Sequence, residues 1–211
     1  MEAILFDLDG TLVYQEPIHR YKLVGQTLKH LGLRALQRDI DRFWFEPLRD
    51  DIIRESFGID PDEFWSVYVD FDTVELRANY THAYNDVDAI HKLKESGFLI
   101  GIVTSASAWI VEFELSLVGE SIADAVVSAN RYTGVKKKPN PEGLLICMNK
   151  LGVETAKGYV GNGPEDQGAA SAVPLPFIRI DRGEYYYPNF SAEPTLKSLN
   201  SLPGYFGIQK P

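Results

Sequence analysis

The sequence predicts an α/β protein whose core is a doubly wound, Rossmann-like parallel sheet, with an all-helical segment inserted into it. Three observations lead to this prediction. Short apolar runs each stop at a polar residue, as buried parallel strands do. Single amphipathic helical patterns separate most of these runs, which is the order of right-handed crossover units. One long stretch, 17–80, shows helical patterns without any strand signal.

The predicted strands of the sheet are five apolar runs. They occupy residues 3–6, 98–103, 125–127, 158–160 and 177–180. Polar side chains follow the runs at or near their ends, namely Asp7, Thr104, Ser128, Asn162 and Asp181. Because ligands of open parallel sheets bind beyond the carboxyl ends of the strands, a functional site is expected among these positions.

The predicted helices of the core lie between these runs. Apolar residues recur at helical spacing in 87–93, 110–117 and 144–151. Gly97 and Gly152 follow two of these patterns, and glycine readily adopts the left-handed conformation that ends many helices. Pro141 suits the first turn of the third helix. These helices are expected to cover the sheet.

The inserted segment is interpreted as a small helical bundle. Its apolar positions mark helices at 18–31, 36–44 and 48–57. A further helix is expected to begin at Asp60, with Pro61 in its first turn and Glu63 completing a capping box. We therefore predict a helical domain at 17–80 and an α/β core formed by 1–16 and 81–211. The chain beyond Asp181 is expected to be irregular and to cover the edge of the sheet.

Composition and charge exclude several classes of protein. The 211 residues carry a formal net charge of -9 and a pI near 4.9, which argues against a general nucleic-acid binder. No apolar stretch approaches the roughly 18 residues of a membrane span. The only cysteine, Cys147, excludes an internal disulfide and falls in an apolar helical pattern, as a core residue does. The N-terminal residues lack the basic start of a signal peptide, so a cytoplasmic location is expected.

Two carboxylates, Asp7 and Asp9, lie two residues apart directly after the first predicted strand. Gly10 follows them and permits a sharp turn with positive φ. Carboxylates this close repel one another, which favours a bound cation or a shared proton. Mg²⁺ prefers such oxygen ligands, and a carboxylate beside a phosphorus centre can act as a nucleophile. The pair is therefore a candidate for a cation site and for a nucleophile toward phosphorus, with a shared proton or a simple polar turn as the alternatives.

Four polar segments follow one another along the chain in a recognisable order. They are residues 7–12, Thr104, Lys138 and residues 160–166. Together they resemble the four motifs of the haloacid dehalogenase-like hydrolases, in the phosphatase branch with a helical cap that includes phosphoglycolate phosphatases. The resemblance covers nearly the whole chain, and the helical insertion lies where that family has its first type of cap.

The resemblance implies a role for each of these residues. Asp7 would be the nucleophile and a Mg²⁺ ligand. Asp9 would act as general acid and base, and its main-chain carbonyl would bind the metal. Thr104 and a following backbone amide, at Ser105, would hold the phosphoryl oxygens. Lys138 would bind the substrate and neutralise the charge on nucleophile and phosphate, which agrees with the electrostatic needs of phosphoryl transfer.

The fourth motif departs from the family pattern at Asn162, where the family usually has a metal-binding Asp. An amide still offers a carbonyl oxygen, but without formal charge. Asp166 matches the second acid of the motif. The resemblance therefore implies a metal site made of Asp7, Asp9, Asn162 and Asp166, with either weaker Mg²⁺ binding or a site rebuilt through Asp166.

The expected function is Mg²⁺-dependent hydrolysis of a small phosphomonoester through an aspartyl-phosphate. The partner would be a small phosphorylated metabolite, without nucleic acid or a membrane, and the sequence leaves monomer and dimer open. The alternatives are a haloacid dehalogenase, a phosphosugar mutase, and a non-catalytic relative that binds a phosphometabolite or a protein, which Asn162 favours. Asp9 favours the phosphatase, because a leaving ester oxygen needs a proton whereas a halide does not.

Overall fold

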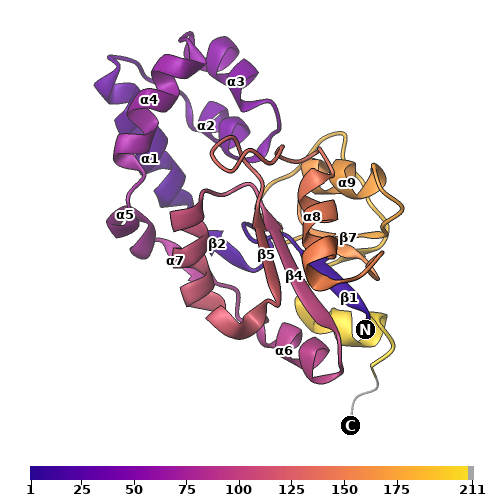
Figure 1. The fold of residues 1–211 in the computed structure, drawn as a ribbon. Helices are drawn as coiled ribbons and strands as arrows, with labels where there is room; N and C mark the ends of the chain where they lie inside the picture. The colour runs from indigo at the N-terminus through magenta and orange to yellow at the C-terminus, as the bar shows by residue number, and fades with distance from the viewer. Residues whose placement is uncertain (209–211) are drawn as a thin grey trace. The chain divides into compact units, whose positions relative to one another are not determined.

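A computed structural model describes residues 1–208 of the chain (Figure 1). It divides into two compact units. One contains residues 1–14 together with the chain from Ala83 onward, and the other contains residues 15–82. The chain passes between the units twice, in β2 (Val13–Gln15) and in β3 (Thr81–Ala83), and these two strands form a small sheet of their own.

The first unit is built on a six-stranded parallel sheet with the strand order β5-β4-β1-β6-β7-β8. The strands are β1 (Ala3–Phe6), β4 (Leu99–Thr104), β5 (Ala125–Ser128), β6 (Tyr159–Gly161), β7 (Phe177–Ile180) and β8 (Thr195–Leu196). In the register of the sheet, Phe6 pairs with Ile102 on one side and with Val160 on the other. The carboxyl ends of the three central strands therefore lie level, and the predicted fold class is confirmed.

Helices cover both faces of this sheet, and Figure 1 shows α8 and α9 on one side and α6 and α7 on the other. Their bounds are α6 (Asp88–Glu95), α7 (Ala108–Val118), α8 (Glu142–Leu151) and α9 (Pro164–Ser171). Every residue of β1 is fully buried, because alternate side chains enter the two hydrophobic cores. Ile4 and Phe6 face one core, and Ala3 and Leu5 face the other.

Gly101, in the middle of β4, shows how closely α8 packs on the sheet. A Cβ at this position would lie 2.6 Å from the Cys147 Sγ and 2.5 Å from a methyl group of Leu5. A side chain at this position would force Leu5 and Cys147 to shift, so glycine favours this close approach of helix and strand. Cys147 is fully buried here, which confirms that it is a core residue.

The second unit is a bundle of helices. They are α1 (Pro17–His30), α2 (Gln37–Phe45), α3 (Arg49–Ile52) with a π-helical turn (Ile53–Phe57), α4 (Pro61–Phe71) and α5 (Val74–Ala78). Its core is aromatic, and the Phe43 ring contacts those of Phe57, Phe64 and Tyr68. Asp60 does cap α4, but it accepts the N–H of Asp62 rather than forming the predicted capping box with Glu63.

The chain beyond Asp181 is more ordered than predicted. β8 extends the sheet by parallel pairing with β7, so that Arg179 pairs with Thr195 and Ile180 with Leu196. Leu199 and Leu202, the latter at the start of α10 (Leu202–Tyr205), are fully buried against the sheet. The prediction of an irregular tail was wrong here because a strand of two residues is too short to produce an apolar run.

None of the helices in residues 1–208 combines the length and the apolar character that crossing a bilayer requires.

Candidate active site

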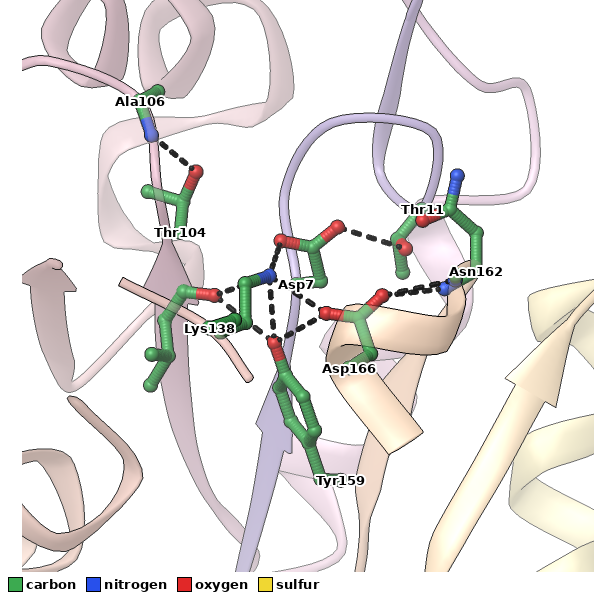
Figure 2. A network of polar contacts seen from close by, with 10 residues as sticks. Asp7, Thr11, Thr104, Ala106, Lys138, Tyr159, Asn162 and Asp166 are labelled. Carbon is green, nitrogen blue, oxygen red and sulfur yellow. Dashed lines mark hydrogen bonds and ion pairs between the residues drawn. The ribbon is translucent and has the colours of Figure 1, made fainter. Parts of the chain in front are cut away.

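The candidate site lies at the carboxyl edge of the sheet in the first unit (Figure 2). Asp7 directly follows β1, Thr104 ends β4, and the loop 162–163 joins β6 to α9. Lys138 comes from the loop between β5 and α8. The level ends of β1, β4 and β6 thus bring residues from three parts of the chain to one edge of the sheet, whereas two other predicted positions, Ser128 and Asp181, contact the Ala106 carbonyl and Lys197.

The centre of the site is the Lys138 ammonium group. Its Nζ lies 2.5 Å from the Asp7 Oδ1 and 2.6 Å from the Asp166 Oδ1. All three side chains are more than nine-tenths buried. Two carboxylates therefore share one ammonium group in the interior, and the triad carries a net charge of minus one when every member is ionised.

Tyr159 completes this cluster and was missed by the sequence analysis. Its hydroxyl oxygen lies 3.0 Å from the Lys138 Nζ, 2.9 Å from the Asp166 Oδ1 and 3.1 Å from the Val103 carbonyl. The ring is fully buried in β6. A buried tyrosine usually finds a partner for its hydroxyl, so a Tyr inside an apolar strand was the available signal.

Asp166 acts here as an anchor for its neighbours. Its Oδ1 accepts from Lys138, while its Oδ2 accepts the backbone N–H groups of Asn162 and Gly163, each at 3.0 Å. A Cβ on Gly161 would lie 2.5 Å from the Asp166 Cγ, so glycine is required for this packing. Both oxygens of Asp166 thus already hold the lysine and the loop after β6.

The electrostatics of the triad raise the pKa of Asp7 to about 7. Burial contributes most, because it removes water from the charged carboxylate, and the nearby charge of Asp166 adds to it. Lys138 opposes both effects. For Lys138 itself, burial alone would lower the pKa, but Asp166 and Asp7 outweigh it and raise the pKa well above its usual value. Lys138 is therefore charged throughout the physiological range.

The turn after β1 presents Asp7 and Asp9 at this edge. Gly10 has a φ of 72°, and its N–H donates to the Val13 carbonyl at 2.7 Å, which closes the turn. A Cβ on Gly10 would lie 2.0 Å from the Asn162 Nδ2, so the Asn162 side chain packs directly on the turn. Asp9 is half-buried and close enough to contribute to the raised pKa of Asp7.

Thr104 and Ser105 offer two hydroxyl groups at the end of β4. Thr104 is buried, and its Oγ1 accepts the Ala106 N–H at 3.1 Å, which leaves its own O–H to donate. The Ser105 Oγ is buried and makes no hydrogen bond within residues 1–208. A buried hydroxyl without a partner is costly, so the Ser105 hydroxyl retains an unused capacity for hydrogen bonding.

The oxygen donors at this edge suit a hard cation such as Mg²⁺. Across the described residues, no group of three His, Cys, Asp or Glu side chains forms a ready metal cage. Mg²⁺ does not need one, because it keeps several waters and binds through one or two carboxylates. Asp7 could supply the carboxylate, and the Asp9 main-chain carbonyl and the Asn162 amide could supply neutral oxygens of the right kind. The negative charge left over in the triad favours a cation here.

Comparison with known proteins places the chain among phosphate-handling hydrolases. The family model described as haloacid dehalogenase-like hydrolase matches residues 4–180. A phosphoglycolate phosphatase of Colwellia psychrerythraea is 28% identical over 209 residues, covering 88% of this chain and 86% of the relative. A pyrophosphatase of Bacillus velezensis is 32% identical over 167 residues, covering 75% of this chain and 72% of the relative.

Solved structures share the fold over nearly the full length. A phosphatase of the same superfamily from Thermococcus onnurineus is 27% identical and superposes with a TM-score of 0.69, covering 99% of both chains. A superfamily hydrolase from Geobacter sulfurreducens is 17% identical with a TM-score of 0.72, covering 97% of this chain and 99% of its own.

The net charge of the buried triad predicts how Asp7→Asn changes the free energy of unfolding. Asp7→Asn should stabilise the metal-free protein at pH 8, because it removes the surplus buried charge and leaves the pair of Lys138 and Asp166 neutral. The pKa of Asp7 is about 7 in the folded protein and 3.8 in the unfolded chain. Ionisation of Asp7 therefore lowers the free energy of unfolding progressively from about pH 4, and the loss reaches its full size above pH 7. The increase in the free energy of unfolding caused by Asp7→Asn should therefore be larger at pH 8 than at pH 5, by an amount of the order of 2 kcal/mol.

Urea unfolding of both proteins in EDTA, followed by circular dichroism at the two pH values, measures this gain. An equal gain at pH 5 and pH 8 would show that Asp7 ionises in the folded protein as it does in the unfolded chain.

Proposed function

The chain belongs to the haloacid dehalogenase-like hydrolase family, and we propose that it hydrolyses a small phosphomonoester with Mg²⁺ through a phosphorylated Asp7. The observation that carries the proposal is the buried triad, in which Lys138 holds Asp7 at the end of the central strand β1. A sugar phosphate or phosphoglycolate is the proposed class of substrate. Relatives named phosphoglycolate phosphatase and pyrophosphatase support a phosphate substrate.

Asp7 would act as the nucleophile. Lys138 lies 2.5 Å from its Oδ1, whereas its Oδ2 has a long contact of 3.5 Å with the Thr11 hydroxyl. A carboxylate oxygen would attack phosphorus, and the bond between phosphorus and the ester oxygen would break. This attack needs the ionised carboxylate, and the Lys138 charge favours that form.

Asp9 would move the protons of both steps. In its protonated form it gives a proton to the leaving ester oxygen. In its ionised form it then takes a proton from the water that attacks the phosphorus of the aspartyl-phosphate. Inorganic phosphate leaves and Asp7 is restored. A positioned acid and base of this kind contributes roughly 10²–10⁴ in rate.

The remaining residues would hold the phosphoryl group. The hydroxyls of Thr104 and Ser105 would donate to its oxygens, and the Lys138 ammonium group would neutralise part of its charge. When bound by Asp7, the Asp9 carbonyl and Asn162, Mg²⁺ would neutralise further charge on the phosphoryl oxygens. Asp166 is proposed to act through Lys138 and the loop it anchors, because both of its oxygens are already engaged.

The helical unit is proposed to be the cap of the family, which selects the leaving group and excludes water from the site. The proposed cap corresponds to the segment predicted at 17–80. Its cations include Arg20, which pairs with Asp41 at 2.5 Å, and Arg54, which pairs with Asp51 at 3.0 Å.

Asp7→Asn should abolish phosphatase turnover, because the amide cannot serve as the covalent nucleophile. The loss should exceed the roughly 10²–10⁴ that removal of a general acid or base costs. Release of p-nitrophenol from p-nitrophenyl phosphate, with and without Mg²⁺, measures the activity of both proteins. Circular dichroism verifies that the variant is folded. Near-normal turnover by folded Asp7→Asn would refute the assignment of the nucleophile.

Asp9→Asn should slow the first chemical step most for substrates with poor leaving groups. A nitrophenolate leaves without much protonation, whereas an alkoxide depends on the proton from Asp9. Rapid-quench measurement of aspartyl-phosphate formation isolates this step from the hydrolysis that follows. A loss of equal size for aryl and alkyl phosphates would mean that Asp9 only shapes the turn.

Asn162→Asp should reduce the Mg²⁺ concentration that the protein needs. A carboxylate binds a hard cation better than an amide does, and the exchange should be worth about 1 kcal/mol or more, or roughly five- to tenfold in affinity. The added charge also lies near the buried triad, so the variant should be less stable than the natural protein in EDTA.

Thermal unfolding across a Mg²⁺ titration measures both effects without using activity. Asn149→Asp, on the exposed side of α8, is the matched control for an added charge. An unchanged Mg²⁺ requirement in Asn162→Asp would place Asn162 outside the metal shell. Turnover that appears only in Asn162→Asp would favour the non-catalytic reading of the natural chain.

A further inference from the structure

Arg182 is a buried cation that the proposed reaction does not use. It lies two residues beyond the end of β7, and its guanidinium forms a two-pronged ion pair with Asp86, at 2.8 Å and 3.0 Å. Both side chains are more than nine-tenths buried. A buried pair of charges is weak evidence for stability, because removing two ions from water can cost as much as their attraction returns.

The guanidinium makes a third contact, to the turn that carries the nucleophile. Its Nη2 donates to the Thr11 main-chain carbonyl at 2.7 Å. The hydroxyl of the same Thr11 lies 3.5 Å from the Asp7 Oδ2. Thr11 thus contacts both the Arg182 guanidinium and the Asp7 carboxylate, although Arg182 and Asp7 lie far apart in sequence.

Arg182 also contacts the region of the first unit where the chain returns from the helical unit. Its guanidinium lies over the Tyr84 ring, 3.8 Å from the ring centre, and the Tyr84 and Tyr14 rings lie 4.9 Å apart. The Tyr84 N–H donates to the Leu12 carbonyl at 2.9 Å. The Arg182 guanidinium therefore contacts both the turn 8–13 and the residue that follows β3.

Asp86 is itself held in place, which makes the pair rigid. Its Oδ2 accepts from the Ser198 hydroxyl at 2.7 Å and from the Leu199 N–H at 2.9 Å. Burial would raise the pKa of Asp86, but the hydrogen bonds from Arg182 and Ser198 outweigh it and lower the pKa. Asp86 therefore stays ionised at neutral pH, and the segment after β8 supports the pair.

We propose that Arg182 is a positioning residue for the nucleophile, held by Asp86 and acting through the Thr11 carbonyl. The inference rests on the proposed function for its catalytic consequence. Arginine is required because its planar fork reaches the Asp86 carboxylate and the Thr11 carbonyl at once, whereas a lysine presents one compact donor group.

Arg182→Lys keeps the charge beside Asp86 and tests this role. The contact to Thr11 should be lost, so amide hydrogen exchange in residues 8–13 should accelerate by about tenfold or more. The kcat for p-nitrophenyl phosphate should fall between about ten- and a hundredfold, with KM changed much less, because misplacing a reacting group slows chemistry more than binding. Asp86→Asn, which loosens Arg182 without removing it, should give smaller changes in the same direction.

Asp124→Asn is the matched control. Asp124 also pairs with a cation, Lys94 at 2.9 Å, and accepts a backbone N–H from Ile100 at 2.8 Å, but it lies near the amino ends of the strands. This variant should lose stability without altering exchange in 8–13 or kcat. If Arg182→Lys and Asp86→Asn behave as Asp124→Asn does, the pair only stabilises the fold and the proposal is overturned.

The exchange measurement separates this inference from the proposed function. A wild-type protein without phosphatase activity would refute the function, and exchange in 8–13 would still decide whether Arg182 holds the turn. An active wild type whose turn and kcat are both insensitive to Arg182→Lys would refute the positioning role alone.

Discussion

The site depends on one buried interaction, the Lys138 ammonium group between the carboxylates of Asp7 and Asp166. Burying three charged groups is costly, and the fold offsets the cost only by satisfying the oxygens and protons that remain. The Tyr159 hydroxyl and the Val103 carbonyl accept hydrogen bonds from the lysine, and two backbone amides after β6 donate to Asp166. These partners come from β4, from β6 and from the loop after β6, whereas Lys138 itself comes from the loop before α8. The parallel order of the sheet is therefore a condition for the chemistry as well as for the core.

Much of this arrangement could be predicted from the sequence, because its signals are local. The apolar runs located β1, β4, β5, β6 and β7, and the acidic turn after β1 located Asp7 and Asp9. The parts that could not be predicted depend on contacts between distant segments. Nothing near Arg182 indicates a pairing with Asp86, 96 residues away. The sequence likewise did not reveal that both carboxylate oxygens of Asp166 accept hydrogen bonds from Lys138 and from the loop after β6. A carboxylate near a strand end could equally have bound a metal.

Asn162 gains a physical explanation from the charge of the triad. Asp7 and Asp166 already outnumber their single ammonium partner, and burial raises the pKa of Asp7 to about 7. A third carboxylate packed on Gly10 would add to this repulsion whenever no cation is bound. The neutral amide avoids that cost and keeps an oxygen donor at the same place. In the proposed mechanism, the amide would therefore bind Mg²⁺ less tightly than a carboxylate but would cost less when no metal is bound.

The turn 7–13 is fixed at three points by different parts of the first unit. Lys138 holds its start at Asp7, Asn162 packs on its middle at Gly10, and Arg182 holds the Thr11 carbonyl near its end. Directly after the last of these points the chain enters β2 and leaves for the helical unit. A bending motion of the connecting strands would therefore act on backbone beyond the Arg182 contact. If Asp7 acts as the nucleophile as proposed, these three contacts would hold its carboxylate in place independently of the chain beyond Val13, and attack on phosphorus depends on such a fixed geometry.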